Sequence, residues 1–166
     1  MEALFHEFTP ETALPWQVIA VRLVFSILFG GILGFERELA ERPAGLRTHM
    51  LVCLASATFA IVAVEIVSMR AFSDDRVQAD PVRLVEAITS GVAFLAAGFI
   101  IFKRGHVRGL TTGAGMWLAA ASGLAAGLGL WLIAAMSCLL GTIVLAVLRR
   151  VEYQFELKQP GARDVE

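Results

Sequence analysis

The sequence predicts an all-α, polytopic membrane protein, built as a bundle of five transmembrane helices. Its 166 residues are 57% hydrophobic and 17% charged, and their mean hydropathy is +0.72. Soluble domains carry about a quarter charged residues, so this chain is too apolar to enclose its hydrophobic residues in one small core. The charges also lie between long apolar runs, which approach the ~20 residues that cross a bilayer as a helix.

The apolar runs give the expected spans in chain order, at about 16–35, 48–69, 84–102, 110–127 and 130–148. A strongly charged turn separates the first two, because five of the seven residues 36–42 are charged. Pro43 and Gly45 break the helix there, since proline lacks an N–H and glycine tolerates positive φ. A polar connection and then a basic turn separate the next spans.

The fourth and fifth spans come from one uncharged stretch, residues 110–148. Its 39 residues are about twice the length of one span, at ~1.5 Å per residue across a ~30 Å apolar layer. We divide it near Gly127 and Gly129, with Trp131 as an anchor at the membrane interface. Three regions follow: a short extracytoplasmic segment 1–15, the five-helix domain 16–150 and a cytoplasmic tail 151–166.

Lysine and arginine are divided unevenly between the two sides of this topology. Ten lie on the side of the 36–47 loop, the 103–109 turn and the tail, and three lie on the other side. Cytoplasmic loops carry the excess of basic residues. We therefore expect a multi-pass protein with its C-terminus in the cytoplasm and its N-terminus outside.

Several classes of function are disfavoured by the same composition. A net charge of −1 excludes a broad basic surface for nucleic acid. No nucleophile, base and acid stand in a recognisable catalytic arrangement, so we expect no enzyme. Cys53 and Cys138 lie within apolar runs, where cysteine behaves as a small hydrophobe and predicts no disulfide framework.

Two stretches resemble the fingerprints of the MgtC/SapB family of bacterial inner-membrane proteins. The first reads Gly-Phe-Glu-Arg-Glu at 34–38 and Pro-Ala-Gly-Leu-Arg-Thr-His at 43–49; the second runs through 80–83, 90–100 and 109–118. The chain is similar to short members that lack the C-terminal ACT-like domain. The fingerprint positions are Gly34, Glu36, Arg37, Glu38, Gly45, Arg47, Thr48, His49, Asp80, Arg83, Gly91, Gly98, Gly109, Thr111, Thr112 and Trp117.

This resemblance implies a role in magnesium homeostasis and in adaptation to low Mg²⁺ or acid stress. It also implies action by binding other membrane proteins, including the membrane sector of the ATP synthase, so a regulatory binding module is the first hypothesis. The alternative is a transporter or channel for Mg²⁺ or another cation, which would require an oligomer because five short spans are few for a conduit. Gly30 and Gly34 form a small-xxx-small pair compatible with a homodimer.

Three charges lie inside predicted spans, each within about two turns of the outer face: Arg22, Glu65 and Glu86. One interpretation is structural, with the side chains reaching outward to water or pairing with each other. The other is a cation entry site, in which Glu65 and Glu86 hold Mg²⁺ through water. No other cofactor is expected.

The charged turn also has two interpretations. It is either a solvated loop with weak surface ion pairs or a structural junction, in which Glu36 pairs with Arg47 and fixes the angle between the first two helices. We favour the junction, and we expect His49 to form a hydrogen bond rather than to bind a metal.

The glycine-rich stretch 109–115 begins the fourth span. It lacks the Gly-Lys-Ser/Thr ending of a P-loop, so we expect Thr111 or Thr112 to cap a helix there. Small residues continue along this span, which predicts that it is the central helix of the bundle.

Overall fold

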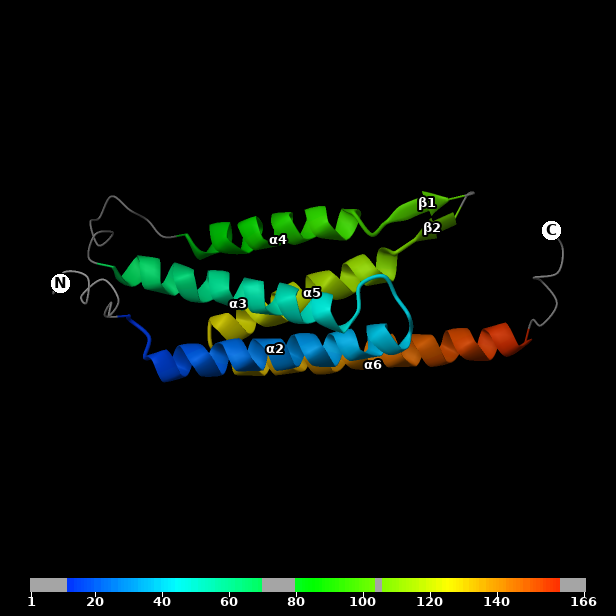
Figure 1. Ribbon diagram of the computed structural model, residues 1–166, viewed down its shortest axis with the longest axis horizontal. Helices are drawn as coiled ribbons and strands as arrows, with labels where there is room; N and C mark the ends of the chain where they lie inside the picture. Colours follow the sequence, from blue (N-terminus) through cyan, green and yellow to red (C-terminus); the bar gives the residue numbers. More distant parts are fainter. Residues whose placement is uncertain (1–11, 70–79, 104–105, 159–166) are drawn as a thin grey trace.

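The structure is a computed structural model that describes residues 12–69, 80–103 and 106–158. In these residues there are five helices and one short hairpin, which are α2 (Trp16–Leu39), α3 (Leu46–Ser68), α4 (Pro81–Ala97), β1 (Ile101–Lys103), β2 (His106–Arg108), α5 (Leu110–Gly127) and α6 (Trp131–Lys158). Successive helices run in opposite directions (Figure 1). The predicted all-α class and the five helices are therefore confirmed.

The alternating directions bring several segments to one end of the bundle (Figure 1). The loop between α2 and α3, the β1–β2 hairpin, the start of α5 and the end of α6 all lie there. We call this the hairpin end, and the opposite one the far end. The grouping of basic segments on one side, which the positive-charge count predicted, thus agrees with the topology of the helices.

In the described part of the chain, three helices are long and apolar enough to cross a membrane on their own, over Trp16–Leu39, Leu46–Ser68 and Trp131–Val151. The other two are shorter or less apolar, because α4 has 17 residues and the 18 residues of α5 are largely glycine and alanine. They complete the bundle by packing against the longer helices.

Helix α5 is the centre of the bundle, as predicted, because it contacts each of the other four helices. Figure 1 places it between α3, α4 and the α2–α6 pair. Its small side chains let neighbouring backbones come close. A Cβ atom added at Gly123 would overlap the carbonyl oxygen of Cys53 in α3, and one added at Gly127 would lie 2.5 Å from that of Ala57. Helices α3 and α5 therefore touch backbone to backbone.

Gly30 and Gly34 make a similar contact between α2 and α3. A Cβ at Gly30 would lie 2.6 Å from the carbonyl oxygen of His49, and one at Gly34 would lie 2.8 Å from the Cα of Leu46. Both glycines are buried inside the chain. The Gly30/Gly34 pair, which is compatible with a homodimer by sequence, thus packs against α3 within one protomer. A homo-oligomer stays a prediction, and it would have to use another surface.

One predicted span ends too late, and one helix extends beyond its predicted span. Helix α4 stops at Ala97 rather than at 102, and the apolar residues after it form β1, with Phe102 paired to Val107. Gly109, at φ 91°, follows β2 and lets the chain enter α5 close to the end of α4, because a Cβ there would overlap the carbonyl of Phe99. Helix α6 continues to Lys158, since its arginines end the apolar span but do not break the helix.

The predicted division between the last two helices is confirmed. Gly129 adopts φ 79°, and the Leu130 amide donates to the carbonyl of Ala125 at 2.8 Å. A left-handed glycine with a bond across five residues is the Schellman ending of a helix. Trp131 then begins α6 and packs edge-on against Phe25 of α2, with ring centroids 5.4 Å apart.

Candidate functional site

Arg22 lies at the far end and binds the backbone of α5. Its Nη1 donates to the carbonyl oxygen of Gly127 at 2.8 Å. That carbonyl is in the last turn of α5, where carbonyls lack helical partners and where a cation is favoured by the helix dipole. Arg22 therefore has a structural role in joining α2 to α5, with a backbone partner that sequence patterns could not identify.

The two acidic residues of the predicted cation site have different surroundings. Glu65 accepts hydrogen bonds from the backbone amides of Ala13 at 2.7 Å and Leu14 at 3.0 Å, so its carboxylate holds the chain at the entry to α2. Glu86 is exposed on α4. Within residues 12–69, 80–103 and 106–158, no group of three or more His, Cys, Asp or Glu could hold a metal. The assignment of Glu65 and Glu86 to Mg²⁺ remains a prediction.

The charged residues of the first fingerprint have two structural roles at the hairpin end. Glu36 and Arg37 form an ion pair, and Glu38 caps helix α3. Helix α2 continues to Leu39, so Glu36 and Arg37 lie in its last turn rather than in a loop. Both are buried, with 9% and 5% of their surface exposed. The Arg37 Nε donates to Glu36 Oε2 at 2.8 Å, and Arg149 Nη1 of α6 lies 3.9 Å from Glu36 Oε1.

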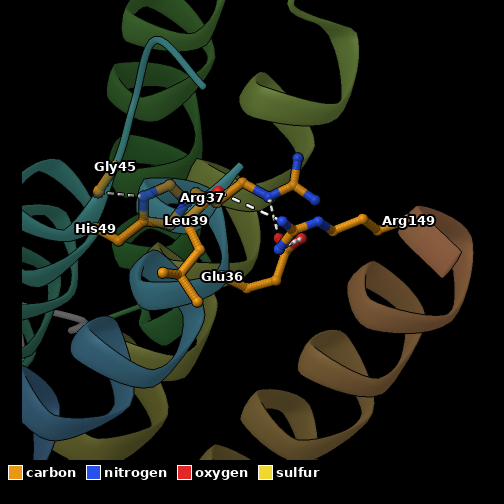
Figure 2. Close-up of polar contacts among 6 residues, drawn as sticks. All are labelled: Glu36, Arg37, Leu39, Gly45, His49 and Arg149. Atoms are coloured by element: carbon orange, nitrogen blue, oxygen red, sulfur yellow. Dashed lines mark hydrogen bonds and ion pairs between the residues drawn. The ribbon is translucent and has the colours of Figure 1, made fainter. Parts of the chain in front are cut away.

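Figure 2 shows the guanidinium groups of Arg37 and Arg149 reaching the same carboxylate from α2 and α6. The prediction that Glu36 pairs with Arg47 is therefore wrong. Arg47 is exposed and forms no ion pair with another described residue, because α3 begins at Leu46 and carries this side chain outward. The junction exists, but it joins α2 to α6 instead of α2 to α3.

The α2–α3 angle is fixed by Glu38 instead. Its Oε2 accepts a hydrogen bond from the amide of Leu46 at 2.9 Å, and this amide is one of the free N–H groups at the start of α3. A Cβ on Gly45 would overlap the same oxygen. The carboxylate of one helix thus caps the next, and Gly45 is required to make room for it.

Replacing Glu38 with alanine is expected to destabilise the protein by about 1 kcal/mol, the usual cost of losing a helix N-cap. Glu38→Gln keeps an oxygen that can accept from Leu46, so it should lose much less. Thermal unfolding of the purified protein in detergent measures both. Equal losses for the two variants would mean that the negative charge, rather than the cap, stabilises this turn.

His49 is fully buried between α2, α3 and α5. Its Nδ1 lies 2.9 Å from the carbonyl oxygen of Gly45, and since a carbonyl only accepts, Nδ1 carries the hydrogen. The other ring nitrogen has no hydrogen-bond partner among the described residues, and a Cβ on Gly115 would come within 3.0 Å of it. The hydrogen-bonding role expected for His49 is the one observed.

A polar pocket of about 120 Å³ opens beside Glu36, Arg37 and Arg149. It is built where the end of α2, the loop after it, the start of α5 and the end of α6 meet. The lining residues are Glu36, Arg37, Arg42, Gly109, Thr111, Thr112, Leu145, Leu148 and Arg149. Five of these nine are fingerprint positions, so the pocket is the candidate functional site.

The capping prediction for the start of α5 was wrong. Gly109 is the residue before the helix, and no side chain caps it. Thr111 and Thr112 lie inside the first turn and face the pocket instead. The first amides of α5, like those of any helix, have no intrahelical partner, and the left-handed glycine before them offers no side-chain acceptor.

The remaining fingerprint residues do not line the pocket. Asp80 caps α4 by accepting from the amide of Val82 at 2.9 Å, and it lies 3.9 Å from Arg83. Gly91 and Trp117 are exposed. Gly98 follows the last turn of α4, and Thr48 lies half-buried at the start of α3.

Sequence patterns identified Arg149 only as the residue that ends the last span. Its place in the site depends on α6 lying alongside α2, with Nη2 3.4 Å from the carbonyl of Leu39. Leu145, one turn earlier, forms an apolar wall of the pocket. The only signal in the sequence is their spacing of four residues, which places them on one helix face.

Residues 23–154 match the family described as the MgtC family. The chain is similar to "Putative magnesium transporter YhiD" of Escherichia coli (strain K12), with 33% identity over 138 residues, which are 81% of this chain and 62% of the relative. It is also similar to "Protein MgtC" of Brucella abortus (strain 2308), with 44% identity over 108 residues, 64% of this chain and 41% of the relative.

A third relative, "Protein SrpB" of Synechococcus elongatus, is 34% identical over 114 residues, 64% of this chain and 61% of the relative. The chain thus spans less than two thirds of the length of each of these relatives. No solved structure matches it.

Proposed function

Because the chain belongs to the MgtC family, we propose that it acts in magnesium homeostasis as a regulatory module that binds other membrane proteins. We place it in the bacterial inner membrane, with the hairpin end in the cytoplasm and the N-terminus outside. No catalytic role is proposed. The membrane sector of the ATP synthase is the partner class that the fingerprint resemblance implies.

The observation that carries this proposal is the closed centre of the bundle. Helix α3 is in backbone contact with α2 at Gly30 and with α5 at Gly123 and Gly127. A conduit through one protomer would have to separate these helices at three levels. Close-packed interiors resist such changes, so the protomer is better suited to present rigid surfaces than to pass an ion.

A cation transporter or channel is the second candidate. It is favoured by one similar protein, whose name is "Putative magnesium transporter YhiD". Since the protomer is closed, the path would run between copies of the chain, with Glu65 and Glu86 at its outer entry and Glu36 at its inner exit. The carboxylate of Glu36 lies between two arginines, which disfavours a passing cation.

A flux measurement separates the two candidates. Purified full-length chain is placed in liposomes that enclose a Mg²⁺ indicator, beside empty liposomes and beside the double variant Glu65→Gln/Glu86→Gln. We expect no Mg²⁺ entry above that of empty liposomes for either protein. In parallel, a strain that lacks the gene is grown at low Mg²⁺ with each version restored, and we expect both versions to rescue growth.

Each outcome decides between the candidates. Growth rescue without flux supports the regulatory module. Flux above empty liposomes overturns it, and loss of that flux in the double variant would assign the path to the two carboxylates. Absence of both flux and rescue, from protein with a helical circular dichroism spectrum, would contradict a role in magnesium homeostasis.

A further inference from the structure

We propose that the pocket at the hairpin end binds a phosphate group that retains a P–OH, either inorganic phosphate or the monoester headgroup of an acidic lipid. The proposal is independent of the choice between regulatory module and conduit, because it concerns a ligand at rest in one protomer. It follows from three features that meet in the pocket: one buried and one half-exposed guanidinium group, an uncapped helix start and a carboxylate oxygen without a hydrogen-bond donor.

The guanidinium groups supply positive charge at a buried position. Arg37 is 5% exposed, and its Nε is used by Glu36. Its two terminal nitrogens form no hydrogen bond with another described residue, although both are donors. Arg149 comes within reach of the same carboxylate from α6 (Figure 2). Two cations therefore face one anion even without Arg42, which also lines the pocket.

The start of α5 adds donors on the opposite wall. The amides in the first turn lack helical partners, and Gly109 offers them no side-chain cap. Their dipoles favour an anion. The side chains of Thr111 and Thr112 line the same wall, and each hydroxyl can donate a further hydrogen bond. An anion in the pocket would satisfy groups from both walls.

Glu36 decides which anion fits. The residue is 9% exposed, and its Oε1 is buried without a hydrogen-bond partner among the described residues. Arg149 Nη1 lies 3.9 Å from this oxygen, which is too far for a hydrogen bond. An ionised carboxylate only accepts, so a ligand that brings a donor as well as negative charge fits this oxygen better than one that only accepts. Sulfate and phosphodiesters have no such donor at neutral pH. Hydrogen phosphate carries a P–OH, and a phosphate monoester carries one in its monoanionic form, below its second pKa of about 6.

The size of the pocket agrees with this ligand. Its volume is about 120 Å³, several times the ~10–15 Å³ needed to hold one water. A tetrahedral oxyanion fits such a space without moving the helices. The apolar wall formed by Leu145 and Leu148 limits the entry of water and so strengthens the charged contacts.

The first arm of the test uses inorganic phosphate as the probe. Binding of radiolabelled phosphate to the purified full-length chain in detergent is measured by equilibrium dialysis, with unlabelled phosphate and sulfate as competitors. We expect saturable binding, displaced by phosphate and at least about tenfold less by sulfate, the size of one charge-assisted contact. Glu36→Gln should remove this preference, because an amide can donate to sulfate.

Arg149→Gln is the main variant, because the Arg149 side chain is half exposed and its loss leaves no buried charge unpaired. It should weaken phosphate binding by about tenfold or more. Arg150→Gln is the matched control. It removes the same charge from the next residue on α6, which is exposed and does not line the pocket.

The second arm tests the lipid source. The protein is placed in nanodiscs of phosphatidylcholine with phosphatidic acid, a monoester, or with phosphatidylglycerol, a diester. If a lipid is the ligand, phosphatidic acid should raise the unfolding temperature more than phosphatidylglycerol, and Arg149→Gln should abolish the difference.

Either source supports the proposal, and the two arms tell them apart. It is overturned if neither inorganic phosphate nor phosphatidic acid binds. It is also overturned if sulfate competes as well as phosphate, or if Arg150→Gln weakens binding as much as Arg149→Gln, because nonspecific attraction to positive charge would then explain the result.

Discussion

Replacing Gly123 with alanine is expected to cost about 1–3 kcal/mol of stability or more, as overpacking does in close-packed interiors. The new methyl group would overlap the carbonyl oxygen of Cys53 and lie 2.8 Å from its Cα. These are backbone atoms of α3, so no side-chain rotation can relieve the contact. Helices α3 and α5 must separate instead, which disturbs the centre of the bundle. Thermal unfolding of the purified protein in detergent measures the loss.

Gly91→Ala is the matched control. Gly91 also lies within a helix, α4, but a Cβ there would have no atom within 4 Å. The same chemical change should be neutral or slightly stabilising, because alanine favours a helix by up to ~1 kcal/mol over glycine. Similar losses at the two positions would contradict contact between helices as the cause, because Gly91 makes no such contact.

Replacing Glu36 with methionine should cost about 3–5 kcal/mol, the range for removing one partner of a buried ion pair. Arg37, whose side chain is 6% exposed, would keep its charge without a carboxylate beside it. Chemical or thermal unfolding of the detergent-solubilised protein measures this loss. Glu86→Met removes a carboxylate that is exposed on α4, and it should change stability far less.

The double variant Glu36→Met/Arg37→Met tests the cause. With both charges removed, no buried ion is left unpaired, so most of the lost stability should return. A double-mutant cycle over the two single variants and the double variant gives the coupling energy. If the two single losses simply add, the pair is not coupled, and the effect of Glu36→Met would come from its contact with Arg149 or from packing.

The topology was predictable because it depends on quantities that are local in sequence. The length of the apolar runs, the charges between them and the left-handed glycine at Gly129 fix the number of helices and the place of the last turn. The small residues of α5 also predicted its central place, since only glycine and alanine allow several helices to touch one neighbour. These properties need no knowledge of which helices meet.

The end of α4 and the partners of the charges were not predictable in this way. Phe99 and the three apolar residues after it suit a span and a strand equally well, and only their pairing with β2 makes the last two of them part of a strand. The partner of Glu36 depends on α6, more than a hundred residues away, lying beside α2. Sequence proximity favoured Arg47, but the start of α3 directs that side chain outward.

The central place of α5 also has a consequence for biosynthesis. Three of the four helices that contact α5, namely α2, α3 and α4, leave the ribosome before it. Helices α2 and α3 pair directly, through Gly30 and the Glu38 cap, whereas α4 is held mainly by α5. The α2–α3 pair can therefore pack first, while α4 has few contacts until α5 is made. The bundle is complete only after α5, the fourth helix in the chain, packs between the others.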